Sequence, residues 1–97
     1  MPYTIEVRPL AAIEILDAFD WYEEQLEGLG SEFLEELDRL YDTLNINPFT
    51  YSFYEKPVRQ GKINRFPYTV VYEIFDQVIV IYSVFMFRQD PEKKRTK

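Results

Sequence analysis

Residues 68–87 read Y-T-V-V-Y-E-I-F-D-Q-V-I-V-I-Y-S-V-F-M-F, the most strand-like stretch of the chain. Residues 68–75 are rich in β-branched and aromatic side chains, which favours a β-strand. Residues 78–87 are apolar at nearly every position, which is typical of a strand covered on both faces at the centre of a sheet. Asp76-Gln77 between them is short enough for a hairpin turn. The sequence therefore predicts an antiparallel pair whose second strand is central.

Two further strands are predicted earlier in the chain. Residues 58–66 form one, ended by Pro67, and Gly61 within it indicates a bulge or a close backbone approach. Residues 3–8 alternate between apolar and polar side chains, which is the period of a half-buried strand.

Two helices are predicted between residue 8 and residue 48. Pro9 opens the first, residues 9–27, and Gly28-Leu29-Gly30 ends it because glycine takes the left-handed cap conformation without strain. Ser31 is the expected cap of the second helix, which Asn47-Pro48 ends. The expected apolar face of the first helix is Ala12, Ile15, Phe19, Tyr22 and Leu26. That of the second is Phe33, Leu34, Leu37, Leu40, Tyr41 and Leu44. A short turn between two helices predicts an antiparallel hairpin.

The connection from the second helix to the next strand, residues 48–57, is unusually aromatic. It contains Phe49, Tyr51, Phe53 and Tyr54. A ten-residue loop must bury something to stay ordered, so we expect these rings to fold back on the helices as a lid. The alternative is a surface that contacts a partner.

These elements predict an α+β fold in the order β-α-α-β-β-β. The expected sheet is four-stranded and mainly antiparallel, with the two-helix hairpin packed on one face. The length of 97 residues fits one domain over residues 1–97, with residues 92–97 as a loose polar tail.

Composition narrows the chemistry that the chain could perform. It has neither cysteine nor histidine, which excludes a disulfide framework, a thiolate metal site and the commonest general base. We therefore expect no metal and no cofactor. The apolar runs are too short to span a membrane and the N-terminus does not resemble a signal peptide, so the expected location is cytoplasmic.

The charge is divided unequally along the chain. Residues 1–55 hold 13 acidic and two basic residues, a net −11, whereas residues 56–97 hold nine basic and four acidic residues, a net +5. The basic half favours an anionic partner, although the total of −6 opposes approach to a nucleic acid.

Several local patterns resemble the RelE/ParE superfamily of bacterial toxins. The first is residues 18–25, A-F-D-W-Y-E-E-Q, followed by Gly28-Leu29-Gly30 and Phe33-Leu34. Asn47-Pro48 is similar to the family's exit from its second helix. Residues 65–68, R-F-P-Y, leading into an alternating strand, and residues 84–91, V-F-M-F-R-Q-D-P, are similar to its later strands. In this order the motifs cover nearly the whole chain.

The resemblance implies a toxin that a cognate antitoxin neutralises. In the RelE branch the toxin cuts messenger RNA on the ribosome, and in the ParE branch it poisons DNA gyrase. Both branches imply toxin–antitoxin systems that inhibit growth and are associated with plasmid stabilisation. A non-enzymatic binding module on the same fold is the alternative function, and a homodimer formed through the aromatic loop is a third.

The candidate catalytic residues are all in the basic half of the chain. Cleavage of RNA without a metal requires groups that move protons and groups that stabilise charge on phosphorus. Arg65 and Arg88 lie in the best-matching motifs, and a guanidinium binds phosphate bidentately. Weaker candidates are Arg59, Lys62, Tyr72 and Tyr82.

These candidates have structural alternatives. Arg59 and Arg65 share strand parity and would face one way, with Lys62 facing the other. Arg65 could instead anchor an acid of the second helix, such as Glu35 or Asp38. Met86 stands where many relatives have histidine, which leaves the enzymatic step open.

The first helix carries apolar residues off its expected buried face. They are Leu10, Ile13, Leu16 and Trp21. We expect Leu10, Ile13 and Trp21 to contact the antitoxin, and Leu16 to complete the core.

Overall fold

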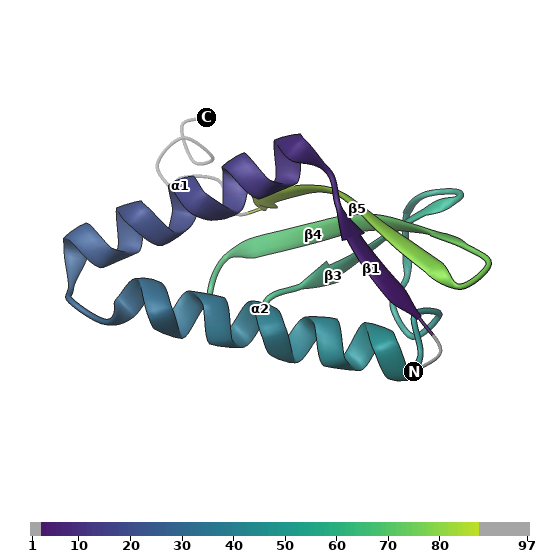
Figure 1. Ribbon diagram of the computed structural model, residues 1–97, viewed down its shortest axis with the longest axis horizontal. Helices are drawn as coiled ribbons and strands as arrows, with labels where there is room; N and C mark the ends of the chain where they lie inside the picture. The colour runs from purple at the N-terminus through teal and green to yellow at the C-terminus, as the bar shows by residue number, and fades with distance from the viewer. Residues whose placement is uncertain (1–2, 88–97) are drawn as a thin grey trace, which may run out of the picture.

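The computed structural model describes residues 3–87, which form seven elements. Their order is β1 (Thr4–Val7), α1 (Pro9–Gln25), α2 (Leu29–Ile46), β2 (Phe53–Glu55), β3 (Val58–Lys62), β4 (Tyr68–Phe75) and β5 (Val78–Met86). The α+β prediction is confirmed, but the sheet has five strands rather than four. The two helices lie antiparallel and cover one face of the sheet (Figure 1).

The sheet order is β1-β5-β4-β3-β2, so β5 is central as predicted. β1 pairs with β5 in parallel, and the other three pairings are antiparallel. The β4–β5 ladder changes register beyond the pair Val71 and Ser83, because Tyr72 pairs with Ile81 and Tyr82 is the extra residue of a bulge. This bulge lets both Ile81 and Val84 face the helices, where they are buried.

The prediction of an aromatic lid over residues 48–57 was wrong. Residues 53–55 form β2, which pairs with β3 at the edge of the sheet. Phe49, Phe53 and Tyr54 are exposed, whereas Tyr51 packs against the core. The strand has only three residues, all of them exposed, so it carries no alternation that sequence patterning could detect.

β3 ends at Lys62, four residues earlier than predicted. The backbone at Gly61 lies close to neighbouring side chains, as expected. A Cβ at this position would lie 3.1 Å from Leu40 Cδ1 and 3.2 Å from the Tyr51 ring. The absent side chain lets α2 and the aromatic loop pack against the sheet.

The buried side of α1 differs from the predicted one. Ala11, Ala18 and Tyr22 are buried, whereas Ala12 and Leu26 are exposed. Large apolar residues occur almost all round this helix, so their spacing alone does not fix the buried side. The small side chains of Ala11 and Ala18 let α1 pack on the sheet, and α2 packs beside it through Phe33, Leu37, Leu40 and Leu44.

The α1–α2 turn is capped by a carboxylate rather than by Ser31. Gly28 has a φ of 93°, the left-handed conformation that the sequence predicted for this turn. The Glu23 side chain accepts hydrogen bonds from the Gly28 N–H at 2.8 Å and the Gly30 N–H at 2.9 Å. It therefore satisfies donors at the start of α2 that would otherwise lack partners. Within residues 3–87, neither helix is long and apolar enough to cross a membrane.

Candidate functional site

An exposed apolar surface follows the outer side of α1. Leu10, Ile13, Leu16 and Trp21 are 57%, 59%, 60% and 54% exposed, and we call these four residues the α1 face. The prediction that Leu16 completes the core was therefore wrong, since the alanines of α1 occupy the sheet side instead.

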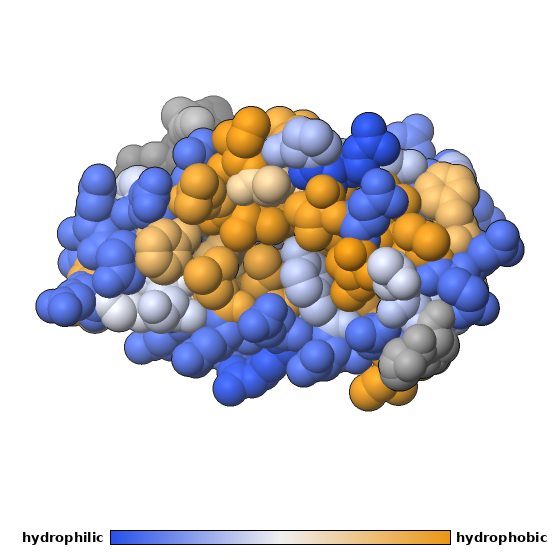
Figure 2. Space-filling view, in the orientation of Figure 1, coloured by the Kyte–Doolittle hydropathy of each residue, from blue (hydrophilic) through white to orange (hydrophobic). Residues whose placement is uncertain are grey.

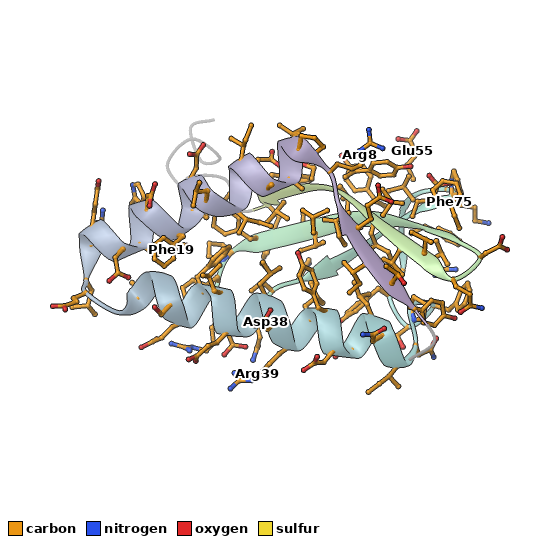
Figure 3. All side chains as sticks on the ribbon, in the orientation of Figure 1. Arg8, Phe19, Asp38, Arg39, Glu55 and Phe75 are labelled. Carbon is orange, nitrogen blue, oxygen red and sulfur yellow. The ribbon has the colours of Figure 1, made fainter. Side chains whose placement is uncertain are left out.

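A groove between the helices continues this surface. It has a volume of about 310 Å³ and is lined by Ala12, Ile15, Leu16, Phe19 and Leu34. Figure 2 shows hydrophobic side chains gathered along α1 and between the helices, with hydrophilic side chains bordering them on α2. Phe19 points into the space between α1 and α2 (Figure 3). The fold thus leaves a rimmed apolar surface of the type that marks protein–protein contacts.

Arg65 lies in the turn between β3 and β4, not on a strand. Its φ of 76° directs it away from the strand direction, so the predicted parity with Arg59 does not apply. Arg65 Nη2 lies 2.8 Å from Glu32 Oε1 and Arg65 Nη1 lies 3.4 Å from Glu36 Oε2. The hydrogen bond to Glu32, followed by that to Glu36, raises the pKa of Arg65. An acid of α2 does anchor Arg65, but the acids are Glu32 and Glu36 rather than Glu35 or Asp38.

Glu36 also holds a second arginine. Arg39 Nη1 lies 2.7 Å from Glu36 Oε2, and the Glu36 side chain is only 4% exposed. Arg39 projects from α2 on the side away from α1 (Figure 3). Glu32, Glu36 and Arg39 were not predicted from the sequence as partners in this cluster. The available signal was Glu36 itself, an acid three residues after Phe33 within the apolar stripe of α2.

Arg59 and Lys62 lie on β3 and perform different tasks. Arg59 Nη1 donates to the Tyr51 carbonyl at 2.6 Å, and the guanidinium lies 4.0 Å from the centre of the Phe53 ring. These contacts fasten the aromatic loop to the edge of the sheet. The Lys62 Nζ lies 4.8 Å from the centre of the Phe87 ring, and its residue is exposed.

The two candidate tyrosines do not lie at one centre with these cations. Tyr72 is fully buried and its hydroxyl donates to the Pro48 carbonyl at 2.7 Å; burial raises its pKa to about 12. The Tyr82 hydroxyl donates to Glu73 Oε1 at 2.7 Å, and that hydrogen bond raises the pKa of Tyr82. Glu73 is four residues along β4 from Thr69, the partner of Lys62, which corresponds to ~13 Å along the sheet. Tyr72 and Tyr82 are therefore structural hydroxyls, poorly suited to proton transfer near neutral pH.

A hollow of about 630 Å³ lies where the β3–β4 turn meets the end of β5. It is lined by Tyr51, Lys62, Ile63, Asn64, Arg65, Phe66, Pro67 and Phe87. Arg65 and Lys62 are thus brought to one surface, while Arg59 and both tyrosines are not among its lining residues. Met86, next to this surface, is 48% exposed. Arg88 lies outside the described residues.

No family model and no curated protein matches the chain, but several solved structures do. The chain superposes on a structure of the chromosomal ParDE toxin–antitoxin system from P. aeruginosa with a TM-score of 0.77. The identity is 12%, over 90% of this chain and 98% of that one. The chain has the RelE/ParE toxin fold.

Structures of RelE share the same fold. The isolated E. coli RelE toxin gives a TM-score of 0.70 at 17% identity, over 97% of this chain and 94% of that one. The intact E. coli RelBE toxin–antitoxin complex gives 0.68 at 18% identity, over 90% and 99% of the two chains. In each comparison the shared fold covers nearly the whole of this chain and nearly the whole of the compared chain.

Proposed function

We propose that this chain is the toxin of a type II toxin–antitoxin system, held inactive by a cognate antitoxin. The observation that carries the proposal is the exposed α1 face on a RelE/ParE toxin fold. Four large apolar side chains, each more than half exposed on one helix, form the kind of apolar surface that marks a protein–protein contact. A RelE structure of this fold was solved as an intact toxin–antitoxin complex.

The α1 face is the proposed antitoxin site, with Leu10, Ile13 and Trp21 as contacts. A helix of the antitoxin could lay its own apolar stripe on these residues and into the adjoining groove. The resulting toxin–antitoxin hetero-oligomer would reside in the cytoplasm. A homodimer through the exposed aromatic rings of residues 48–57 competes with this assembly, and a monomer by light scattering of the free chain would count against the homodimer.

The hollow containing Arg65 and Lys62 is the proposed target side. Cleavage of messenger RNA on the ribosome and poisoning of DNA gyrase are the two modes that this fold suggests. In the first mode, Arg65 and Arg88 would stabilise charge on the phosphorane. In the second, the same cations would contact the gyrase–DNA complex and no acid–base group would be needed.

A second candidate function, a binding module without catalysis, is favoured by two specific observations. Arg65 is neutralised by Glu32 and Glu36, and Tyr72 and Tyr82 are held by structural hydrogen bonds. Such a module would keep the antitoxin surface and have no effect on growth.

Controlled expression of the chain alone in its native host tests these functions. Growth, translation and DNA supercoiling would be followed together, with co-expressed antitoxin as the control. Early loss of translation with cut messenger RNA supports the RelE mode, and growth arrest with DNA damage and intact translation supports the ParE mode. Unchanged growth from well-expressed, folded protein would refute the toxin proposal and favour the binding module.

A further inference from the structure

Arg65 is held by two carboxylates that differ in their environment. Glu32 and Glu36 lie one turn apart on α2, and each takes one terminal nitrogen of the guanidinium. The Glu32 side chain is 47% exposed, whereas the Glu36 side chain is 4% exposed. The shorter contact, 2.8 Å, is the exposed one. Arg65 therefore pairs with one solvent-exposed carboxylate and one buried carboxylate.

The exposed contact is the easier one to break. Ion pairs in water contribute little stability because solvent screens the charges and the side chains lose rotational freedom. Glu36 is more constrained, but its 2.7 Å contact with Arg39 keeps its charge compensated whatever Arg65 does. Arg65 Nη2 can therefore leave Glu32 while Nη1 stays near Glu36.

The surface next to Arg65 suits a chain of phosphates and bases. The hollow combines the cation Lys62 and the amide of Asn64 with three aromatic rings, of which Phe87 is exposed, Tyr51 is half-buried and Phe66 is buried. Cations beside exposed aromatic rings are the combination that binds single-stranded nucleic acid, since phosphates pair with the cations and bases stack on the rings. Phe87 is 39% exposed, and the Lys62 ammonium already lies over its ring.

We propose that Glu32 gates Arg65 by competing with the phosphates of a single-stranded nucleic acid that binds in this hollow. The bound strand takes Arg65 Nη2 from Glu32, while Glu36 keeps the guanidinium positioned. Glu32 then sets the affinity of the surface for anions although it contributes no favourable contact to the ligand. The gate rests on the target side of the proposed function, but not on which growth-inhibition mode operates.

The test measures binding of a fluorescently labelled single-stranded oligouridine to the full chain by anisotropy at low salt. Glu32→Gln keeps the shape of the side chain and removes its charge. Glu35→Gln is the matched control, because Glu35 is an exposed acid of the same helix with no ion pair among residues 3–87. We expect Glu32→Gln to tighten binding about two- to fivefold more than Glu35→Gln, the range set by the free energy of an exposed ion pair.

A double-mutant cycle with Arg65→Gln separates the gate from general electrostatics. In the Arg65→Gln background, Glu32→Gln should have no more effect than Glu35→Gln, because the competing pair is gone. Equal effects of Glu32→Gln and Glu35→Gln in the wild-type background would overturn the gate. Failure of wild type and Glu32→Gln alike to bind the oligonucleotide would also overturn it.

The same data test the gate formed by Glu32 separately from the proposal that Arg65 belongs to the target side. If Arg65→Gln weakens binding while the two glutamate variants behave alike, the surface stands and the gate falls. If Arg65→Gln leaves binding unchanged, Arg65 has no place on the target side at all. Thermal melts of each variant, monitored by circular dichroism, confirm that the compared proteins are folded.

Discussion

Charged side chains in this molecule act mainly as links between elements. Glu14 of α1 shows this: its Oε1 accepts the Ser83 hydroxyl and the Val84 N–H, both at 2.8 Å, next to the β5 bulge. Glu23 and Glu36 act in the same way at the helix turn and at Arg65. Sequence periodicity does not reveal such links, because the partners of these acids are 5 to 70 residues away in the chain. The pairing of Arg65 with a helix acid was predictable from charge. Which acid it contacts depends on the positive φ of Arg65, which sets the direction of its side chain.

Tyr72 gives a prediction at the scale of one residue. Its folded pKa of about 12 exceeds the ordinary value of 10.0, because burial disfavours the phenolate. On raising the pH, the unfolded chain loses this proton first, so stability is complete below pH 10 and falls as the pH rises toward 12. We expect the free energy of unfolding, from urea denaturation at a series of pH values, to decline over this window.

Two variants isolate the contribution of Tyr72 to that decline. Tyr72→Phe should make it shallower, and should cost about 1–3 kcal/mol at neutral pH by leaving the Pro48 carbonyl unpaired. Burial also raises the pKa of Tyr41 to about 12, so part of the slope persists. Tyr54→Phe, a half-exposed control, should leave both quantities unchanged. An identical slope in wild type and Tyr72→Phe would contradict this account.

The helix hairpin shows what sequence patterning resolves at the scale of elements. Both helices, their Gly28 turn and their stop at Asn47 were predictable, because each depends on local chemistry. The rotation of α1 was not, because it depends on which side chains are small enough to face the sheet. β2 was not predictable either, because residues 53–55 become a strand by pairing with the edge of β3 and show no strand pattern in their own sequence.

Gly30→Ala tests how closely the two helices pack. A Cβ at this position would lie 2.7 Å from the Phe19 carbonyl oxygen and 2.9 Å from Glu23 Oε1. A backbone carbonyl cannot rotate away, so overpacking of about 1–3 kcal/mol should outweigh the gain of about 1 kcal/mol in helix propensity. We expect a net loss of up to ~2 kcal/mol in the free energy of unfolding, measured in urea.

Ser31→Ala, at the next position, is the control for Gly30→Ala. Ser31 is exposed and does not cap α2, so its substitution should change stability by less than ~0.5 kcal/mol. A Gly30→Ala protein as stable as wild type would show that the helices can separate freely at this point.

At the scale of the whole molecule, the proposed antitoxin site and the proposed target side lie on two separate surfaces. The apolar α1 face and the hollow at the β3–β4 turn are built from different elements, so each should be separable by substitution. Most members of the α1 face were predictable from their spacing in the sequence. In the hollow, only Arg65 and Lys62 were predicted as site residues, because the other lining residues come together only in the folded chain, around the turn between β3 and β4.

Substitutions on the α1 face should remove antitoxin binding without unfolding the chain. Ile13→Glu and Leu16→Glu place charges on side chains that are more than half exposed, so stability should change by less than ~0.5 kcal/mol. Affinity for the co-expressed antitoxin, measured by calorimetry, should fall about 10- to 100-fold. Ile46→Glu, at an 82% exposed position on α2, is the control and should bind normally. Normal binding by both α1 variants would move the antitoxin to another surface.

The parallel pairing of β1 with β5 has a consequence for the order of events during synthesis. Of the described elements, β1 is the first to leave the ribosome, and its neighbour in the sheet, β5, is the last. At roughly 5–20 residues per second, several seconds separate the two. Throughout this time the nascent chain holds a helix hairpin with no completed sheet to pack on. The sheet therefore cannot close around β5 until every other element of the fold has been synthesised.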